Sequence, residues 1–235
     1  MNLHVAITRA LPGAERTAAR VRAFGAAPIL APLISIVACA YDTNVDGAQA
    51  LLFTSASGVR AFPNARARTS MPVLTVGDAT AQAAREAGFA DVSSADGDAR
   101  ALAALAQARL DPAAGKLIHI SGDHVAGDLS GALAAAGFRV ERRIAYAARA
   151  ALAPPPAFSQ PLDLTLFHSP RAARIFVGLG APGAAGMSAA CLSEAVAEEA
   201  RKAPWRSVIV APAPREDALL QAALGGAGAS GGASA

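Results

Sequence analysis

Apolar residues along this chain gather in short runs, and most runs are followed by a polar turn and a segment of helical periodicity. The run at 50–53 precedes the turn at 54–58, and the run at 162–166 precedes a turn at Ser169. Short apolar runs of this kind predict buried strands, and apolar positions three or four apart predict helices. Strands that alternate with helices favour parallel sheets with helices on both faces. The predicted fold class is therefore α/β.

The pattern also places most of the individual elements. Gly25, Gly88 and Gly137 stand where three predicted helices should end, because glycine adopts the left-handed conformation of a helix C-terminus. Pro32 interrupts an extended stretch and favours a sheet edge or a linker there. The expected strands and extended stretches are 3–8, 28–39, 50–53, 73–76, 91–93, 117–120, 139–148 and 162–166, and the expected helices are 14–24, 79–87, 99–110 and 128–136.

Three segments of the chain occur twice in the same order. FTSASGVRAF at 53–62 returns as FHSPRAARIF at 167–176, an offset of 114 positions. LHVAITR, starting at 3, has the outline of KLIHISG, starting at 116, and VLTVGDATAQAAREAG, starting at 73, resembles AACLSEAVAEEARKAP, starting at 189. A nearly constant offset predicts a tandem duplication, and this offset is too long for a solenoid repeat. We expect two similar α/β units with a cleft between them.

Composition narrows the functional class. No apolar run approaches the ~20 residues of a membrane helix, and the first residues lack the basic and apolar regions of a signal peptide. The only two cysteines, Cys39 and Cys191, form no CxxC pair, which favours a reduced, cytoplasmic setting. We read both as small apolar core residues.

The net charge of +3 is spread along the chain. No basic run is interleaved with aromatic residues, which argues against nucleic-acid binding. A mild positive excess suits a small acidic ligand, although ordinary solubility charge explains it equally well. No GxGxxG follows the first strand and no Walker motif is present, so a nucleotide-dependent enzyme lacks support. His119 and His124 have no third metal ligand at a suitable spacing, so we expect no metal site and place His119 in the core.

These segments resemble the uroporphyrinogen-III synthase family, the cyclising lyases of tetrapyrrole biosynthesis. The resemblance rests on ITRA at 7–10, the two ten-residue copies, TVGDATAQAAREAG at 75–88 and the stretch 137–146 that ends in IAY. It spans nearly the whole chain except the low-complexity tail 225–235, which we expect to be disordered. It implies two flavodoxin-like domains, one of 1–34 with 149–235 and one of 38–146, joined by a two-segment antiparallel linker.

The resemblance also implies a reaction. Linear hydroxymethylbilane is closed to uroporphyrinogen III with loss of water and inversion of the last pyrrole ring. Because the type I isomer forms without an enzyme, the protein must control geometry more than reactivity. No metal or organic cofactor is needed. We expect a monomer, and a transient contact with hydroxymethylbilane synthase stays open.

Site residues follow from the family's motifs. Tyr146 matches the tyrosine at the linker, where a phenol can protonate the departing hydroxide, although a half-buried linker residue is the plain alternative. The turns that would hold the substrate's carboxylates contribute Thr8, Arg9, Ser55, Ala56, Ser57, Gly77, Thr80, Ser121, Gly122, Ser169 and Arg171. For the serines, simple helix capping remains an equal reading, and Arg9 is either a partner for a propionate or an exposed arginine.

The second half departs from the family's pattern. In the aligned repeats, Val196 corresponds to Thr80 and so lacks its hydroxyl, and Ser193 corresponds to Gly77. His168 replaces a residue that is often serine or threonine, and its role is open. These departures motivate an alternative, a degenerate homologue that binds a small anion such as a tetrapyrrole without turnover.

Overall fold

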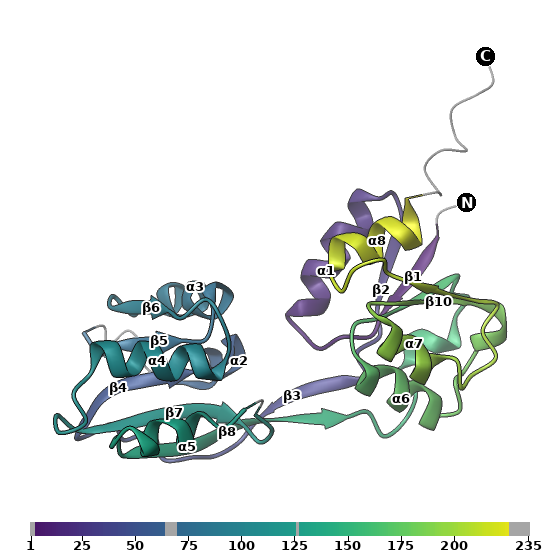
Figure 1. Ribbon diagram of the computed structural model, residues 1–235. Helices are drawn as coiled ribbons and strands as arrows, with labels where there is room; N and C mark the ends of the chain where they lie inside the picture. Colours follow the sequence, from purple (N-terminus) through teal and green to yellow (C-terminus); the bar gives the residue numbers. More distant parts are fainter. Residues whose placement is uncertain (1–2, 64–69, 126, 226–235) are drawn as a thin grey trace. The chain divides into compact units, whose positions relative to one another are not determined.

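The computed structural model describes residues 3–63, 70–125 and 127–225 (Figure 1). Nearly all of the tail 225–235, which was predicted to be disordered, therefore lies outside the described residues. The chain divides into two compact units: unit 1, Met1–Ser35 with Arg149–Ala235, and unit 2, Ile36–Ala148. The chain passes between them twice, within β3 (Ile34–Ala38) and β8 (Val140–Ala150).

Unit 1 is built on a five-stranded parallel sheet. Its strands are β1 (His4–Ile7), β2 (Ala27–Leu30), β9 (Leu164–Phe167), β10 (Ser188–Cys191) and β11 (Ser207–Val210). They lie in the order β11-β10-β9-β1-β2, and every neighbouring pair is parallel. Numbered along the chain, this is the 2-1-3-4-5 order of a flavodoxin-like sheet.

Helices cover both faces of this sheet, as the alternation of side chains along its strands requires. Val5 and Ile7 pack with α1 (Gly13–Ala23) and α8 (Glu216–Leu224) on one face. Ala6 and Phe167 pack on the other face with α6 (Pro170–Gly178) and α7 (Glu194–Ala200). The predicted α/β class with parallel sheets is confirmed.

Unit 2 repeats this plan with one strand more. Its strands β4 (Ala48–Phe53), β5 (Val73–Thr75), β6 (Val92–Ser94) and β7 (Lys116–Gly122) join β8 and β3 in the order β3-β8-β7-β4-β5-β6. Helices α2 (Ala56–Ala61) and α3 (Asp78–Ala87) cover one face, and α4 (Ala99–Arg109) and α5 (Leu129–Ala135) cover the other. Strands β7, β8, β4, β5 and β6 occupy the places of β1, β2, β9, β10 and β11, as the sequence repeat predicts.

Strands β3 and β8 run antiparallel. The Cys39 amide donates to the Ala145 carbonyl, and the Ala151 amide donates to the Leu33 carbonyl, both at 2.9 Å. Pro32 lies just before this ribbon, between two edge strands, so its predicted edge or linker position is confirmed. Cys39 follows β3 and is only half-buried, so its predicted place in the core is wrong, whereas Cys191 is fully buried.

Local signals in the sequence located most boundaries. Gly25, Gly88 and Gly137 have φ of +77°, +108° and +86° just after α1, α3 and α5, as the helix-ending prediction requires. The prediction missed β11 and α8, whose residues SVIV at 207–210 and EDALLQAAL at 216–224 carry a β-branched run and a helical period. In the described part of the chain, the short 3₁₀ helices η2 (Pro156–Ser159) and η3 (Ala184–Gly186) complete the assignment. None of the described helices is long and apolar enough to cross a membrane.

Each unit has an aromatic cluster contributed partly by the repeated ten-residue segment. In unit 1, Phe176 lies 4.8 Å from Phe158, 5.6 Å from Phe167 and 5.2 Å from Trp205, measured between ring centroids. Its repeat partner in unit 2 is Phe62, which packs against two other phenylalanine rings. The two clusters belong to different cores.

Phe176→Ala is expected to destabilise unit 1 by about 3–5 kcal/mol, because it removes a buried ring and leaves a cavity. Urea unfolding followed by the fluorescence of Trp205, the chain's one tryptophan, reports this loss. Phe62→Ala is the matched control, since it should shift the far-ultraviolet circular dichroism transition and leave the Trp205 transition in place. Equal shifts of the Trp205 transition in both variants would contradict two separate cores.

Candidate active site

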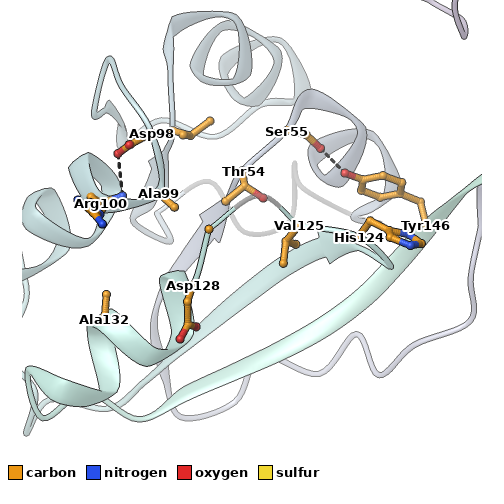
Figure 2. A pocket seen from close by; sticks show the side chains of 12 residues that line it. Thr54, Ser55, Asp98, Ala99, Arg100, His124, Val125, Asp128, Ala132 and Tyr146 are labelled. Atoms are coloured by element: carbon orange, nitrogen blue, oxygen red, sulfur yellow. Dashed lines mark hydrogen bonds between the residues drawn. The ribbon is translucent and has the colours of Figure 1, made fainter. Parts of the chain in front are cut away.

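The strand order of unit 2 reverses between β4 and β7, which makes this place the topological switch point of the sheet. From β4 the chain continues to β5 on one side, and from β7 it continues to β8 on the other. In such a sheet the two connections diverge and leave a crevice at the carboxyl ends of the strands, where ligands usually bind. A pocket of about 690 Å³ opens there (Figure 2). Its lining residues are Thr54, Ser55, Val76, Asp98, Ala99, Arg100, His124, Val125, Gly127, Asp128, Ala132 and Tyr146.

A tyrosine and a serine meet at the wall of this pocket. β8 carries Tyr146, whose phenol oxygen lies 2.6 Å from Ser55 Oγ (Figure 2). Ser55 is also the N-cap of α2, because its Oγ accepts a hydrogen bond from the Gly58 amide at 3.2 Å. The capping reading is therefore correct for Ser55, and for Ser169, which caps α6 through the Ala172 amide at 3.2 Å. For Ser55 the cap and the contact with Tyr146 use the same oxygen.

Gly122 sets the position of the tyrosine ring. A Cβ atom at Gly122 would lie 2.7 Å from Cε2 and 2.8 Å from Cζ of Tyr146, which is closer than non-bonded carbon atoms approach one another. Gly122 and Tyr146 are also register partners in the pairing of β7 with β8. Gly122 was predicted to bind substrate, and the structure gives it a packing contact with the tyrosine that lines the pocket.

The predicted turn beginning at Ser121 is wrong, because Ser121 and Gly122 are the last residues of β7. These residues pair with Ile144 and Tyr146 of β8. Arg142 on β8 also contacts this strand end: its Nε donates to Ser121 Oγ at 2.9 Å and its Nη2 donates to the Gly122 carbonyl at 2.8 Å. The next helix begins only at Leu129, with Asp128 as its N-cap. Ser121 is fully buried, and its hydroxyl donates to the Gly122 carbonyl and accepts from Arg142, so it stabilises the end of the strand.

The first turn of α4 supplies charges to the pocket that the sequence reading missed. Asp98 caps α4 by accepting from the Arg100 amide at 2.8 Å and the Ala101 amide at 3.0 Å, and these bonds lower the pKa of its carboxyl group. Arg100 is exposed and brings a guanidinium to the same wall. The signal was present, since an aspartate before a helical pattern typically marks an N-cap.

The other predicted residues of unit 2 lie at the starts of its helices. Ala56 and Ser57 open α2, and Gly77 is the N-cap of α3, where a Cβ atom would meet nothing within 4 Å. Thr80 is only 6% exposed in the first turn of α3, and its repeat partner Val196 is 1% exposed in α7. That position faces the interior in both units, which explains why valine can replace threonine there. A contact of these residues with substrate stays a prediction.

In unit 1 the corresponding crevice lies between β1 and β9, and an internal carboxylate occupies it. Glu216, at the start of α8, accepts hydrogen bonds from His168 Nε2 at 3.2 Å, Arg9 Nη1 at 3.3 Å and Arg20 Nη1 at 2.9 Å. The Thr17 hydroxyl also donates to Glu216. Arg9, which was predicted to meet a propionate or solvent, thus pairs with a glutamate that the sequence reading did not single out.

Two further predicted residues lie at the same edge of unit 1. The Thr8 hydroxyl is buried and donates to the Leu166 carbonyl at 2.7 Å, joining β1 to β9. Arg171 is exposed in the first turn of α6. Among the described residues, no group of three or more histidine, cysteine, aspartate or glutamate side chains is arranged to hold a metal ion.

Comparison with known proteins identifies the family. The family model for uroporphyrinogen-III synthase HemD matches residues 15–221. The chain belongs to the uroporphyrinogen-III synthase family. The resemblance seen in the sequence is thereby confirmed, together with the class of enzyme, a cyclising lyase.

A solved structure supports the fold of this synthase-family chain. The uroporphyrinogen-III synthetase of Helicobacter pylori 26695 superimposes with a TM-score of 0.63 at 14% identity, over 96% of this chain and 99% of that one. A mutant uroporphyrinogen III synthase of Thermus thermophilus covers 93% of this chain and 96% of its own at 20% identity, with a TM-score of 0.49. A search of the curated proteins finds no match.

Gly122→Ala is expected to push the Tyr146 ring away from Ser55 and to slow cyclisation by the synthase. Gly178→Ala is the matched control, since nothing lies within 4 Å of its new methyl group. Initial rates of bilane consumption, with thermal melts of both variants, check the expectation. A Gly122→Ala variant with the wild-type rate would show that the ring position does not matter.

Glu216 should make unit 1 sensitive to acid. Its hydrogen bond from His168, with that from Thr17 and the charge of Arg9, lowers its pKa from 4.5 to about 2 against the opposing effect of burial. A depressed carboxyl pKa stabilises the fold above the unfolded-state value near 4.5, and this stabilisation disappears as the pH falls towards 2.

Glu216→Gln should therefore lower Tm at pH 6–7, and the difference from wild type should shrink as the pH falls below about 4.5. Thermal melts between pH 2 and 7 measure this, with the exposed Glu198→Gln as control. A difference in Tm that is independent of pH would show that the charge of Glu216 contributes nothing.

Proposed function

We propose that this protein closes hydroxymethylbilane to uroporphyrinogen III, with loss of water and inversion of ring D, and that the pocket of unit 2 holds the reacting end of the bilane. The observation that carries the proposal is the Ser55–Tyr146 hydrogen bond in the switch-point pocket of a chain from this family. A phenol placed there supplies the one proton transfer with which a side chain can assist the first step.

The reaction begins when the terminal hydroxymethyl group of the bilane loses its hydroxyl. The C–O bond breaks, the oxygen takes a proton and leaves as water, and the pyrrole becomes an electrophilic azafulvene. Its carbon bonds to the substituted carbon of ring D and forms a spiro intermediate. That intermediate fragments and closes again with ring D inverted, and a ring proton is lost as aromaticity returns. The protein must hold the chain ends so that this carbon is attacked.

In this proposal the phenol of Tyr146 gives its proton to this leaving group. Ser55 Oγ already accepts a hydrogen bond from the Gly58 amide, so its own hydrogen is available to the phenol oxygen 2.6 Å away. With Ser55 as the donor, the Tyr146 hydrogen points away from Ser55 and is free for the departing hydroxyl. After transfer, the Ser55 hydroxyl stabilises the phenolate.

The substrate's acetate and propionate groups need positive partners. Helices α3 and α4 begin at the pocket's edge, and their dipoles favour anions there. Among the described residues, no side chain caps α3, so its first amides are free to bind an anion, whereas Asp98 already binds two amides of α4. Arg100 adds an exposed guanidinium at the same wall. We propose that these groups, with the turns at Ser55–Ser57 and Gly77–Thr80, bind carboxylates of the bilane. The side-chain carboxylates of Asp98 and Asp128 are already engaged as helix caps, so each is hydrogen-bonded to the backbone of its own helix.

The chemistry needs no cofactor, since the electrophile arises from the substrate itself. We propose that the protein acts as a cofactor-free monomer in the cytoplasm, where its cysteines, Cys39 and Cys191, remain reduced. Hydroxymethylbilane is short-lived because it cyclises without an enzyme. We therefore also propose that it is received through transient contact with hydroxymethylbilane synthase.

The direct test supplies freshly generated hydroxymethylbilane to the purified protein and measures the ratio of isomers III and I. The proposal predicts a large excess of isomer III. Tyr146→Phe should keep that preference and lower kcat about tenfold, less than the ~10²–10⁴ typical of general acids, because the azafulvene forms readily. Isomer I alone from folded wild-type protein would refute the proposal, and full activity of Tyr146→Phe would remove the proton-donor role.

A further inference from the structure

A buried histidine lies directly behind the pocket and contacts one of its hydroxyls. His119 Nε2 lies 3.2 Å from Thr54 Oγ1, and Thr54 lines both the 690 Å³ pocket and a smaller one of about 350 Å³ next to it. We propose that His119 is a positioning residue that orients the Thr54 hydroxyl to donate a hydrogen bond to a carboxylate of the substrate. The inference rests on the proposed function and deepens it.

Strand register brings these groups together. In the pairing of β4, β7 and β8, Leu52 is the partner of His119, and His119 is the partner of Arg142. Thr54 follows Leu52 by two positions along the direction of β4, which keeps it on the same face of the sheet. Strands β7 and β8 and the residue just after β4 thus place an imidazole, a guanidinium and a hydroxyl in a row across the sheet.

The imidazole is neutral. His119 is only 2% exposed, and burial together with the nearby charge of Arg142 lowers its pKa from 6.5 to about 4. A neutral ring carries one hydrogen, so His119 is either a donor or an acceptor towards Thr54. The choice decides whether the Thr54 hydrogen points at His119 or into the pocket.

The surroundings of Nδ1 indicate the donor form. Within the described part of the chain, His119 Nδ1 is buried without a hydrogen-bond partner. A buried N–H without an acceptor is rarer than a buried acceptor without a donor, so Nδ1 is the nitrogen that carries no hydrogen. The positive charge of the nearby Arg142 also favours a lone pair over an N–H at this atom. His168 shows the same arrangement: its Nε2 faces the carboxylate of Glu216, and its Nδ1 is the buried nitrogen without a partner.

With Nε2–H of His119 donating to Thr54 Oγ1, the Thr54 hydrogen is free to turn towards the pocket. A carboxylate oxygen is the acceptor that matches it, because the bilane carries several carboxylates and Arg142 and Arg100 supply positive charge nearby. The Asp128 carboxylate also lines both pockets, but its Oδ1 accepts from the Gly131 amide at 2.8 Å and serves as a helix cap. His119 borders the smaller pocket but is only 2% exposed, so we assign it a role through the Thr54 hydroxyl.

Four single variants and one double variant test this arrangement through the KM for hydroxymethylbilane. Thr54→Ser keeps the hydroxyl and should behave as wild type. Thr54→Val should raise KM about tenfold, the cost of one hydrogen bond to a charged group. His119→Gln places an amide N–H near the position of Nε2 and should keep the wild-type KM. The shorter His119→Asn cannot reach Thr54 and should raise KM as much as Thr54→Val does. The double variant Thr54→Val/His119→Asn should be no worse than Thr54→Val.

Several results would overturn the inference while the proposed function stands. All of them presuppose a wild-type enzyme that forms isomer III. One is an unchanged KM in Thr54→Val. The others are an equal rise in KM in His119→Gln and His119→Asn, or increases in KM that add up in the double variant. A purely structural histidine would lower Tm in His119→Asn and leave KM unchanged. If the wild type forms no isomer III, the proposed function fails separately. The same variants are then compared for binding of uroporphyrinogen III, where equal affinities, or no binding by any of them, reject the inference.

Discussion

The structure depends on one topological constraint, the reversal of strand order inside a parallel sheet. Where the chain leaves β4 in one direction and β7 in the other, no connection covers the carboxyl ends of the strands, and the pocket of unit 2 opens there. The Ser55–Tyr146 pair and its neighbours stand close to that point: Ser55 and Thr54 after β4, Gly122 at the end of β7, and Tyr146 on β8. The site therefore follows from the fold, and the side chains determine what the crevice can do.

The duplicated unit shows how the same crevice can take another role. Unit 1 has the same strand order, but Glu216 fills the position with an internal carboxylate bound by Arg9, Arg20, Thr17 and His168. Unit 2 instead presents Ser55, Tyr146 and Arg100 to an open pocket. Both crevices favour a carboxylate, one from the chain itself and one, in our proposal, from the substrate. In our proposal the two crevices thus share an anion chemistry and differ in which anion they bind.

Much of this was predictable from the sequence, for local physical reasons. Apolar runs, glycines with left-handed φ and capping serines act over a few residues, so most strands, three helix ends and the caps at Ser55 and Ser169 were located correctly. The family motifs pointed to Tyr146, although not to its contact with Ser55, which joins residues 91 positions apart. Glu216 was missed because its four partners come from distant segments. Ser121 and Gly122 were misplaced because pairing with the distant strand β8 carries β7 past Ile120.

The measurement that tests the central claim most directly is amide hydrogen exchange with and without bound uroporphyrinogen III. The account predicts protection at the carboxyl ends of the strands of unit 2, in peptides covering residues 54–58, 76–80 and 122–125. Protection confined to the opposite edge of that sheet, around Lys116 and Arg139, would contradict it, because the switch-point pocket would then not be where the tetrapyrrole binds.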